Sequence, residues 1–292
     1  MKLEPLVFAE DRHAAIWGCE RWLVSAHPAA PSVVASGAFA GMRLDELAAR
    51  YGDDLYGTRA GGRFPVLVKD ILANDRLSVQ VHPSEKTARP PESEPKTELW
   101  YVLESSRGGG IIAGAVPGVT RDALQDAIRR GRAEDLLPFR ETGAGEFIFI
   151  PGGLVHALCG GVRVLEVQQP SVTTYRLYDW NRTDASGRPR ELHVEAGLAA
   201  ADLSLAPVYA KGGFESRFFR IREFPLSSSA CIPADPETFR VFFAADGSFT
   251  VASDAGRLEV AEHGAVLLPA ACSAELEPSG GASAAGLVEI TV

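Results

Sequence analysis

The chain has 292 residues, of which 46% are hydrophobic and 23% are charged, a balance typical of globular proteins with a substantial core. Its formal net charge of −9 at pH 7 argues against a general nucleic-acid surface. No apolar stretch approaches the length of a membrane span, and the acidic residues that follow Met1 predict that no secretory signal peptide is present. We therefore expect neither nucleic acid nor a membrane as a partner.

The four cysteines are far apart and form no paired metal-binding motif. This usage is typical of reduced thiols in a cytoplasmic protein. Cys159 lies three residues after His156, so a role as a soft metal ligand stays open beside simple packing.

The first elements in chain order are a helix and a buried strand. Helical spacing and a glycine stop predict a helix over 44–52. The apolar run 64–72 predicts a buried strand that carries one lysine, Lys69. A cation inside such a run needs a partner, unless its ammonium group reaches solvent at the strand end.

Residues 77–83 predict a short strand that ends at Pro83, because proline cannot donate to a ladder. Side chains alternate between the two faces of a strand, so Gln80 and His82 point the same way and Ser78 shares their face. Val79 and Val81 point the other way, into apolar packing.

Two further strands carry polar groups at their ends. Glu98 opens an apolar strand, and the strand at 145–151 is followed by a glycine turn and His156. A lone histidine is commonly a hydrogen-bonded buried residue, and Glu98 alone could be a surface charge. Together with Gln80 and His82, however, they offer two imidazoles and two oxygen donors, which suit a divalent metal with an open position.

The middle of the chain adds helices and two more strands. A threonine cap and a glycine stop predict a helix over 120–131, and a short helical piece follows at 133–137. Alternation predicts a strand over 162–169 that carries Glu166, and another over 173–180 with Arg176 and Tyr178 on one face. A further helix is predicted over 192–201.

From about residue 215 the chain becomes a series of short strands separated by turns. Residues 264–271 repeat the glycine, apolar run and proline of 145–153, but Ala274 stands where the first copy has His156. We expect a catalytic domain over 1–205 with a helical insertion at about 119–138, and a β-module over 215–292 that lacks the metal site. Many short strands and few helices predict a mainly β protein built of double-sheet jelly rolls.

These motifs resemble those of the type I mannose-6-phosphate isomerases, zinc enzymes of the cupin superfamily, in their compact bacterial form. The resemblance covers about two-thirds of the chain, and its most specific runs are 78–83 (Ser-Val-Gln-Val-His-Pro) and 96–101 (Lys-Thr-Glu-Leu-Trp-Tyr). It implies a cupin-type jelly-roll barrel and a second, degenerate β-barrel module. It also implies one Zn²⁺ per chain, held by Gln80, His82, Glu98 and His156.

The reaction implied by the resemblance interconverts mannose 6-phosphate and fructose 6-phosphate through an enediol. The resemblance places Lys69, Lys96, Glu166 and Arg176 around this sugar phosphate, and Ser78 and Arg182 are weaker candidates for binding the phosphate. Glu166 is the candidate proton shuttle or, alternatively, a structural carboxylate that pairs with Arg176. Arg176 would stabilise enediolate charge, and Lys96 would serve both catalysis and binding. We expect a monomer or a weak homo-oligomer.

Two other functions stay open at this point. The first is another metal-dependent cupin enzyme, such as an iron oxygenase, although such sites usually hold more histidines and would leave the lysines and arginine without a purpose. The second is a non-catalytic sugar-phosphate sensor that kept the pocket. Loss of the base would mark a sensor, and Glu166 is present.

Overall fold

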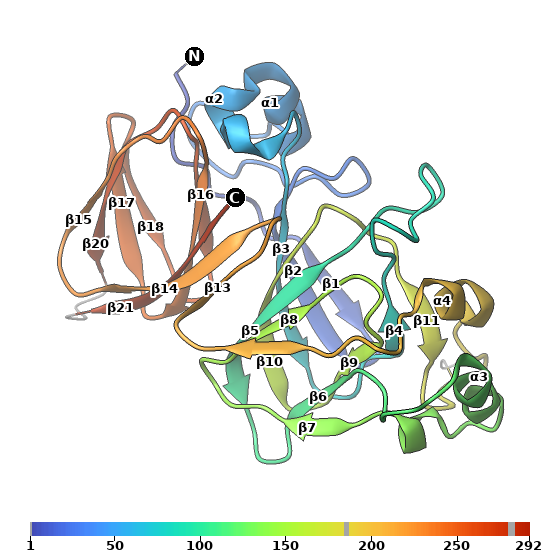
Figure 1. The fold of residues 1–292 in the computed structure, drawn as a ribbon. Coiled ribbons are helices and arrows are strands. Elements are labelled where there is room, and N and C mark those ends of the chain that lie inside the picture. The colour runs from blue at the N-terminus through green and yellow to red at the C-terminus, as the bar shows by residue number, and fades with distance from the viewer. Residues whose placement is uncertain (1, 184–186, 280–283) are drawn as a thin grey trace. The chain divides into compact units, whose positions relative to one another are not determined.

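The computed structural model describes residues 2–183, 187–279 and 284–292 and is built mainly of strands, as predicted (Figure 1). Its contacts divide the chain into two compact units. The first unit consists of Met1–Arg12, Arg21–Asp70 and Gly212–Val292, and the second unit of His13–Glu20 and Ile71–Lys211. The predicted assignment of a catalytic domain to 1–205 and of a β-module to 215–292 stays a prediction.

The second unit is built around two sheets. One has five strands in the order β11-β4-β9-β6-β7, and the other has seven in the order β1-β2-β3-β10-β5-β8-β12. The chain passes between the two units inside β1, β2 and β3, so this unit holds only the parts of those strands within its own ranges. The bounds are β1 Arg12–Ala15, β2 Gly18–Ser25, β3 Leu67–Ala73, β4 Val79–Val81, β5 Glu98–Ser105, β6 Gly110–Ala113, β7 Phe139–Glu141, β8 Phe147–Ile150, β9 His156–Leu158, β10 Val162–Gln168, β11 Tyr175–Tyr178 and β12 Val208–Ala210.

The two sheets of the second unit share a buried apolar core. Trp100 of β5, Ile111 of β6 and Leu158 of β9 belong to one cluster of packed side chains, although β5 lies in the larger sheet and β6 and β9 in the smaller. This core is the jelly-roll interior that the apolar strands predict.

Helices cover the other face of the five-stranded sheet. Helix α3 (Arg121–Arg129) and α4 (Val194–Ala200) lie beside β11 in Figure 1, and Ala133 of the short η2 (Ala133–Leu136) packs in the same cluster as both helices. Leu124 of α3 and Leu198 of α4 pack in one cluster with Val79 and Val81 of β4. Since Val79 and Val81 face the helices, the alternate residues of this strand face the jelly-roll interior, as predicted.

The first unit contains α1 (Leu44–Tyr51), α2 (Asp53–Tyr56), η1 (Thr58–Ala60) and two further sheets. Their strand orders are β13-β14-β21-β16-β19 and β15-β20-β17-β18. The bounds are β13 Gly213–Glu215, β14 Arg220–Leu226, β15 Ala230–Ile232, β16 Arg240–Asp246, β17 Phe249–Ser253, β18 Gly256–Val260, β19 Ala265–Leu268, β20 Ala274–Pro278 and β21 Ala285–Thr291. Early and late parts of the chain meet here, because Leu6 pairs with Leu267 and the Phe64 and Phe239 rings lie 4.8 Å apart.

The repeat that relates residues 264–271 to 145–153 is also present in the structure. Strand β8 ends just before Pro151 and β9 begins at His156, while β19 ends just before Pro269 and β20 begins at Ala274. The two segments therefore place a histidine and an alanine at equivalent strand starts, and only the first can offer an imidazole.

The predicted elements differ from the observed ones mainly at their ends. The strand expected over 64–72 begins at Leu67, after Pro65, and the helix expected over 192–201 is α4. The Thr120 cap is confirmed, since its side chain accepts a hydrogen bond of 3.2 Å from the Ala123 backbone amide. None of the helices in the described ranges is long and apolar enough to span a membrane.

Candidate metal centre and active site

One wall of the site is the inner face of the five-stranded sheet. Arg176 of β11 lies opposite Gln80 of β4, and Gln80 lies opposite His156 of β9. Directly opposed residues of an antiparallel pair project to the same face. This register brings together Arg176, Gln80 and His156, three predicted site residues from strands far apart in the sequence, and His82 follows β4 on the same face.

The other wall comes from β5 and β10 of the larger sheet. Glu98 lies opposite Gln168, and Trp100 lies opposite Glu166. The Trp100 indole Nε1 donates a 3.0 Å hydrogen bond to Glu166 Oε2. This ladder therefore places Glu98 and Glu166, two predicted acidic residues, on one face of the second wall.

His82, Glu98 and His156 meet at one buried point. Their ligand atoms all lie within 4.8 Å of one another, and each imidazole Nε2 is 3.3 Å from a Glu98 oxygen. The Nδ1 atoms of His82 and His156 lie 2.9 Å from the carbonyl oxygens of Thr173 and Leu154. A carbonyl can only accept, so each Nδ1 carries the proton and each Nε2 presents its lone pair to the centre.

The centre fits a divalent cation. Glu98 Oε1 and His156 Nε2 are buried, and within the described parts of the chain neither has a hydrogen-bond partner, whereas Glu98 Oε2 is paired with the Lys96 ammonium group. Buried polar atoms without partners are costly, and a cation would satisfy both of them. Two imidazoles and one carboxylate are a donor set typical of catalytic zinc.

Lys96 lies against the same cluster. Its Nζ is 2.8 Å from Glu98 Oε2, 3.1 Å from His82 Nε2 and 3.9 Å from Glu166 Oε1. Burial favours the neutral amine, but the charges of Glu166 and Glu98 outweigh it and raise the pKa of Lys96. A buried ammonium group therefore lies next to the candidate metal ligands.

The ligands are in the protonation states that a metal requires. Burial, and then the charge of Lys96, lowers the pKa of His82 to about 3, and burial lowers the pKa of His156. Burial alone would raise the pKa of Glu98, but the charge of Lys96 outweighs burial and holds this pKa well below its usual value. At neutral pH the centre thus offers neutral imidazoles and a carboxylate.

The structure holds Arg176 at the edge of this face. Its Nη1 donates a 2.7 Å hydrogen bond to the Glu191 carbonyl, and its backbone amide donates to His193 Nδ1 at 3.2 Å. Burial and the nearby charge of Arg190 lower the pKa of Arg176. Its Nε is buried and, among the described residues, has no hydrogen-bond partner.

The remaining predicted substrate contacts lie in different surroundings. Lys69 belongs to the first unit, where it is buried and its Nζ is 4.6 Å from the centroid of a Trp22 ring. Ser78 is buried just before β4. Arg182 forms ion pairs with Asp179 at 2.6 Å and with Asp75 at 3.2 Å, so two carboxylates already bind its guanidinium group.

Gln168 is a further polar residue on the face of Glu98 and Glu166 that was not among the predicted site residues. Its amide is fully buried opposite Glu98, and its Nε2 donates to the carbonyls of Gln169 and Ser171 at 2.9 and 2.7 Å. The available signal was alternation, because Gln168 shares the face of Glu166 on the predicted strand.

Cys159 is not a member of the metal cluster. It packs in the apolar core beneath the helices, and burial raises the pKa of its thiol to about 11. Simple packing therefore accounts for this cysteine, as one of the two predicted alternatives.

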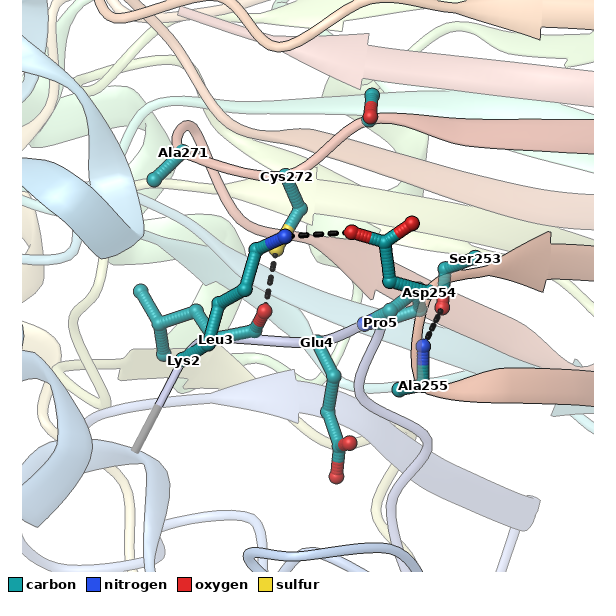
Figure 2. A pocket seen from close by; sticks show the side chains of 10 residues that line it. Lys2, Leu3, Glu4, Pro5, Ser253, Asp254, Ala255, Ala271 and Cys272 are labelled. Carbon is teal, nitrogen blue, oxygen red and sulfur yellow. Dashed lines mark hydrogen bonds and ion pairs between the residues drawn. The ribbon is translucent and has the colours of Figure 1, made fainter.

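Among the described residues, hollows of about 250, 310 and 440 Å³ lie elsewhere on the surface. Figure 2 shows the smallest, where the Cys272 thiol donates a 3.0 Å hydrogen bond to the Leu3 carbonyl. None of the three is lined by a predicted site residue.

Comparisons with known proteins point to one family. Residues 9–114 match the family model of the type I phosphomannose isomerase catalytic domain. A mannose-6-phosphate isomerase of Streptococcus mutans is 35% identical over 91% of this chain and 92% of its own length. The match covers most of both chains, so it is not limited to a shared motif.

The solved structures that this chain resembles are also mannose 6-phosphate isomerases. The mannose 6-phosphate isomerase of Bacillus subtilis is 27% identical, with a TM-score of 0.86 over 99% of this chain and 100% of its own. This likeness confirms the predicted cupin-type fold. A zinc-bound mannose 6-phosphate isomerase is 14% identical, with a TM-score of 0.71 over 98% of each chain, and at that identity it shows the fold alone.

Proposed function

Because the chain belongs to the type I mannose-6-phosphate isomerases, we propose that it interconverts mannose 6-phosphate and fructose 6-phosphate through an enediol at the buried centre of His82, Glu98 and His156. The observation that supports this site is the convergence of the three side chains, with unpartnered buried atoms, beside Lys96 and Glu166. A sensor and another metal-dependent cupin enzyme are not favoured, because the relative of 35% identity is an isomerase.

The proposed metal is zinc, one ion per chain, because two imidazoles and a carboxylate meet at one buried point. His82, Glu98 and His156 would hold it, and the amide oxygen of Gln80 is the proposed fourth donor because Gln80 lies directly opposite His156. When bound, zinc supplies a Lewis acid that polarises or orients the sugar oxygens.

The chain's own residues would move the proton. Isomerisation of the aldose removes the proton from C2 and delivers one to C1. Glu166 is the proposed carrier, since its carboxylate lies beside the centre and Trp100 fixes one of its oxygens. The Lys96 ammonium group, 3.9 Å from Glu166, would donate to a sugar oxygen as negative charge develops.

Positive groups would balance the charge of the intermediate and of the phosphate. Arg176 lies on the metal face with an unused buried Nε, so it is the proposed partner of the enediolate. Lys69, Lys96 and Ser78 are the proposed phosphate contacts, and Arg182 is the weaker candidate because it already binds two carboxylates. The monomeric or weakly oligomeric state and the cytoplasmic location stay predictions.

A coupled assay tests this function. Purified protein with zinc should convert mannose 6-phosphate to fructose 6-phosphate, and metal analysis of protein purified without added metal should find zinc rather than iron. Wild-type protein that binds zinc but leaves mannose 6-phosphate unchanged would contradict the proposed reaction while keeping the metal site.

A further inference from the structure

Arg176 is held by a segment that follows it in the chain, Arg190–His193, here named the arginine strap. Two residues of the strap contact Arg176 directly, and a third anchors the strap to the strand end. These contacts all lie within the second unit.

His193 fixes the backbone of Arg176 from two sides. The Arg176 amide donates to His193 Nδ1 at 3.2 Å, and the His193 amide donates to the Arg176 carbonyl at 2.7 Å. An amide N–H can only donate, so Nδ1 carries no proton and the ring is a fixed acceptor. The carbonyl of His193 in turn accepts from the Gly197 amide at 2.8 Å, which joins the strap to α4.

Glu191 fixes the guanidinium group. Its carbonyl accepts from Arg176 Nη1 at 2.7 Å. The Nε of Arg176 is buried and has no hydrogen-bond partner within the described ranges. The strap thus uses one donor to orient the group and leaves another to meet an oxyanion on the metal face.

Arg190 anchors the start of the strap. Its Nε donates to Asp179 Oδ2 at 2.7 Å, and its Nη2 donates to Asp179 Oδ1. Asp179 is buried and follows Arg176 by three residues, so the ion pair closes a loop from the strand end to the strap. A bidentate arginine–carboxylate pair fixes direction as well as distance.

We propose that His193 and Arg190 are positioning residues that hold the Arg176 guanidinium group where the enediolate charge develops. This inference rests on the proposed function, in which Arg176 meets that charge. A displacement of about 1 Å in a catalytic group can cost on the order of 100-fold in rate. The strap should therefore affect turnover far more than substrate binding.

The first test compares two substitutions of one residue. His193→Leu removes the acceptor, whereas His193→Asn places an amide oxygen close to the position of Nδ1. We expect His193→Leu to lower kcat by about 10- to 100-fold with little change in KM or zinc content, and His193→Asn to recover most of the loss. Arg190→Met and Arg190→Lys form a second pair. Arg190→Met should lower kcat more than Arg190→Lys, which keeps the positive charge.

A double-mutant cycle separates positioning from general stability. In an Arg176→Lys background, His193→Leu and Arg190→Met should lower kcat by less than about twofold further, because the group that they position has been replaced. Arg220→Met breaks an exposed arginine–carboxylate pair with Glu215 and is the matched control, which should leave kcat unchanged.

The outcomes distinguish this inference from the function on which it rests. An inactive wild type overturns both. If the wild type is active, the role of the strap alone is overturned in either of two cases. In the first, His193→Leu and Arg190→Met both leave kcat unchanged. In the second, they lower kcat by the same factor with Arg176 present and in the Arg176→Lys background. If His193→Leu does not fold, the same criteria are applied to Arg190→Met and Arg190→Lys and to the double-mutant cycle of Arg190→Met with Arg176→Lys.

Discussion

Each imidazole of the metal centre is oriented by a backbone carbonyl and not by a charged side chain. Thr173 and Leu154 accept from the Nδ1 atoms, so the Nε2 lone pairs face Glu98 without protonated histidine nearby. The single cation in contact with the cluster is Lys96, among the residues that the structure describes. Replacement of its contact to Glu98 by a metal ion would leave the ammonium group free to meet substrate.

Substitution of Glu166 separates its two predicted roles. If Glu166 carries the proton, Glu166→Gln should lower kcat by about 10²- to 10⁴-fold and leave zinc content unchanged. The measurement is steady-state kinetics with metal analysis on the same samples. Glu104→Gln, an exposed acid on β5, is the matched control. A variant that keeps its turnover but loses stability would instead make Glu166 a structural carboxylate.

At the scale of elements, β4 separates the site from the helices. Its valines pack against α3 and α4, and Gln80 faces the interior. A shift of one residue in register would reverse both faces, so packing of the helices also fixes the direction of the metal ligands. Stability and metal binding can nevertheless be tested apart, because Leu124 of α3 and Leu198 of α4 pack with the valines, on the face away from the metal ligands.

Leu124→Ala tests that separation. Leu124 is fully buried in α3 beneath β4, so its truncation should lower the free energy of unfolding by about 2–5 kcal/mol. Zinc content of the folded variant should stay at the wild-type level. Urea unfolding measures the change, and Leu192→Ala, at a position that is 41% exposed, should cost far less. Equal losses in the two variants would contradict the packing described for α3.

Asp179 makes the stability of the fold depend on pH. Burial would raise the pKa of its carboxyl, but hydrogen bonds from Arg190 and Arg182 outweigh burial and lower it. A carboxyl with a lowered pKa stabilises the fold above its unfolded pKa, and that contribution is lost as pH falls through the folded pKa. We expect Asp179→Asn to cost about 2 kcal/mol at pH 7.

The same variant tests the direction of this pH dependence. The difference in unfolding free energy between wild type and Asp179→Asn should be constant from about pH 5 to 8 and shrink below about pH 4. Urea unfolding across this range measures it. A difference that grows as the pH falls would contradict the ion-pair assignment.

Local patterns predict much of the second unit and little of how distant segments meet. Alternation placed Gln80 and His82 on one face, and apolar runs identified the strands of Glu98 and Glu166. Pairing between strands far apart depends on the whole fold, so the register that joins Arg176 to Gln80 was outside local reasoning. The contacts of Arg176 with His193 were missed for the same reason, since a short polar segment carries no periodic signal.

At the scale of the whole molecule, the order of the chain differs from the order of its units. Residues 21–70 group with 212–292, although the pattern of short strands begins only near residue 215. Leu6 and Leu267 exchange backbone hydrogen bonds of 2.8 Å in both directions, which links the two ends of the chain within the first unit. Nothing in either segment alone indicates the other as its partner.

Truncation near residue 215 tests this arrangement. Removal of the C-terminal strands would expose Phe64 and Leu6, whose partners Phe239 and Leu267 would be absent. We expect insoluble or unfolded protein, as judged by soluble yield and circular dichroism. Soluble, active protein that ends near residue 215 would contradict the prediction.

The most direct test of the metal centre measures zinc and isomerase activity together in wild type and His82→Ala, with His13→Ala, an exposed histidine, as the control. We predict about one zinc per chain and active enzyme for wild type and control, and loss of both zinc and activity for His82→Ala. A His82→Ala protein that keeps its zinc and its turnover would contradict the assignment of the active site to this cluster.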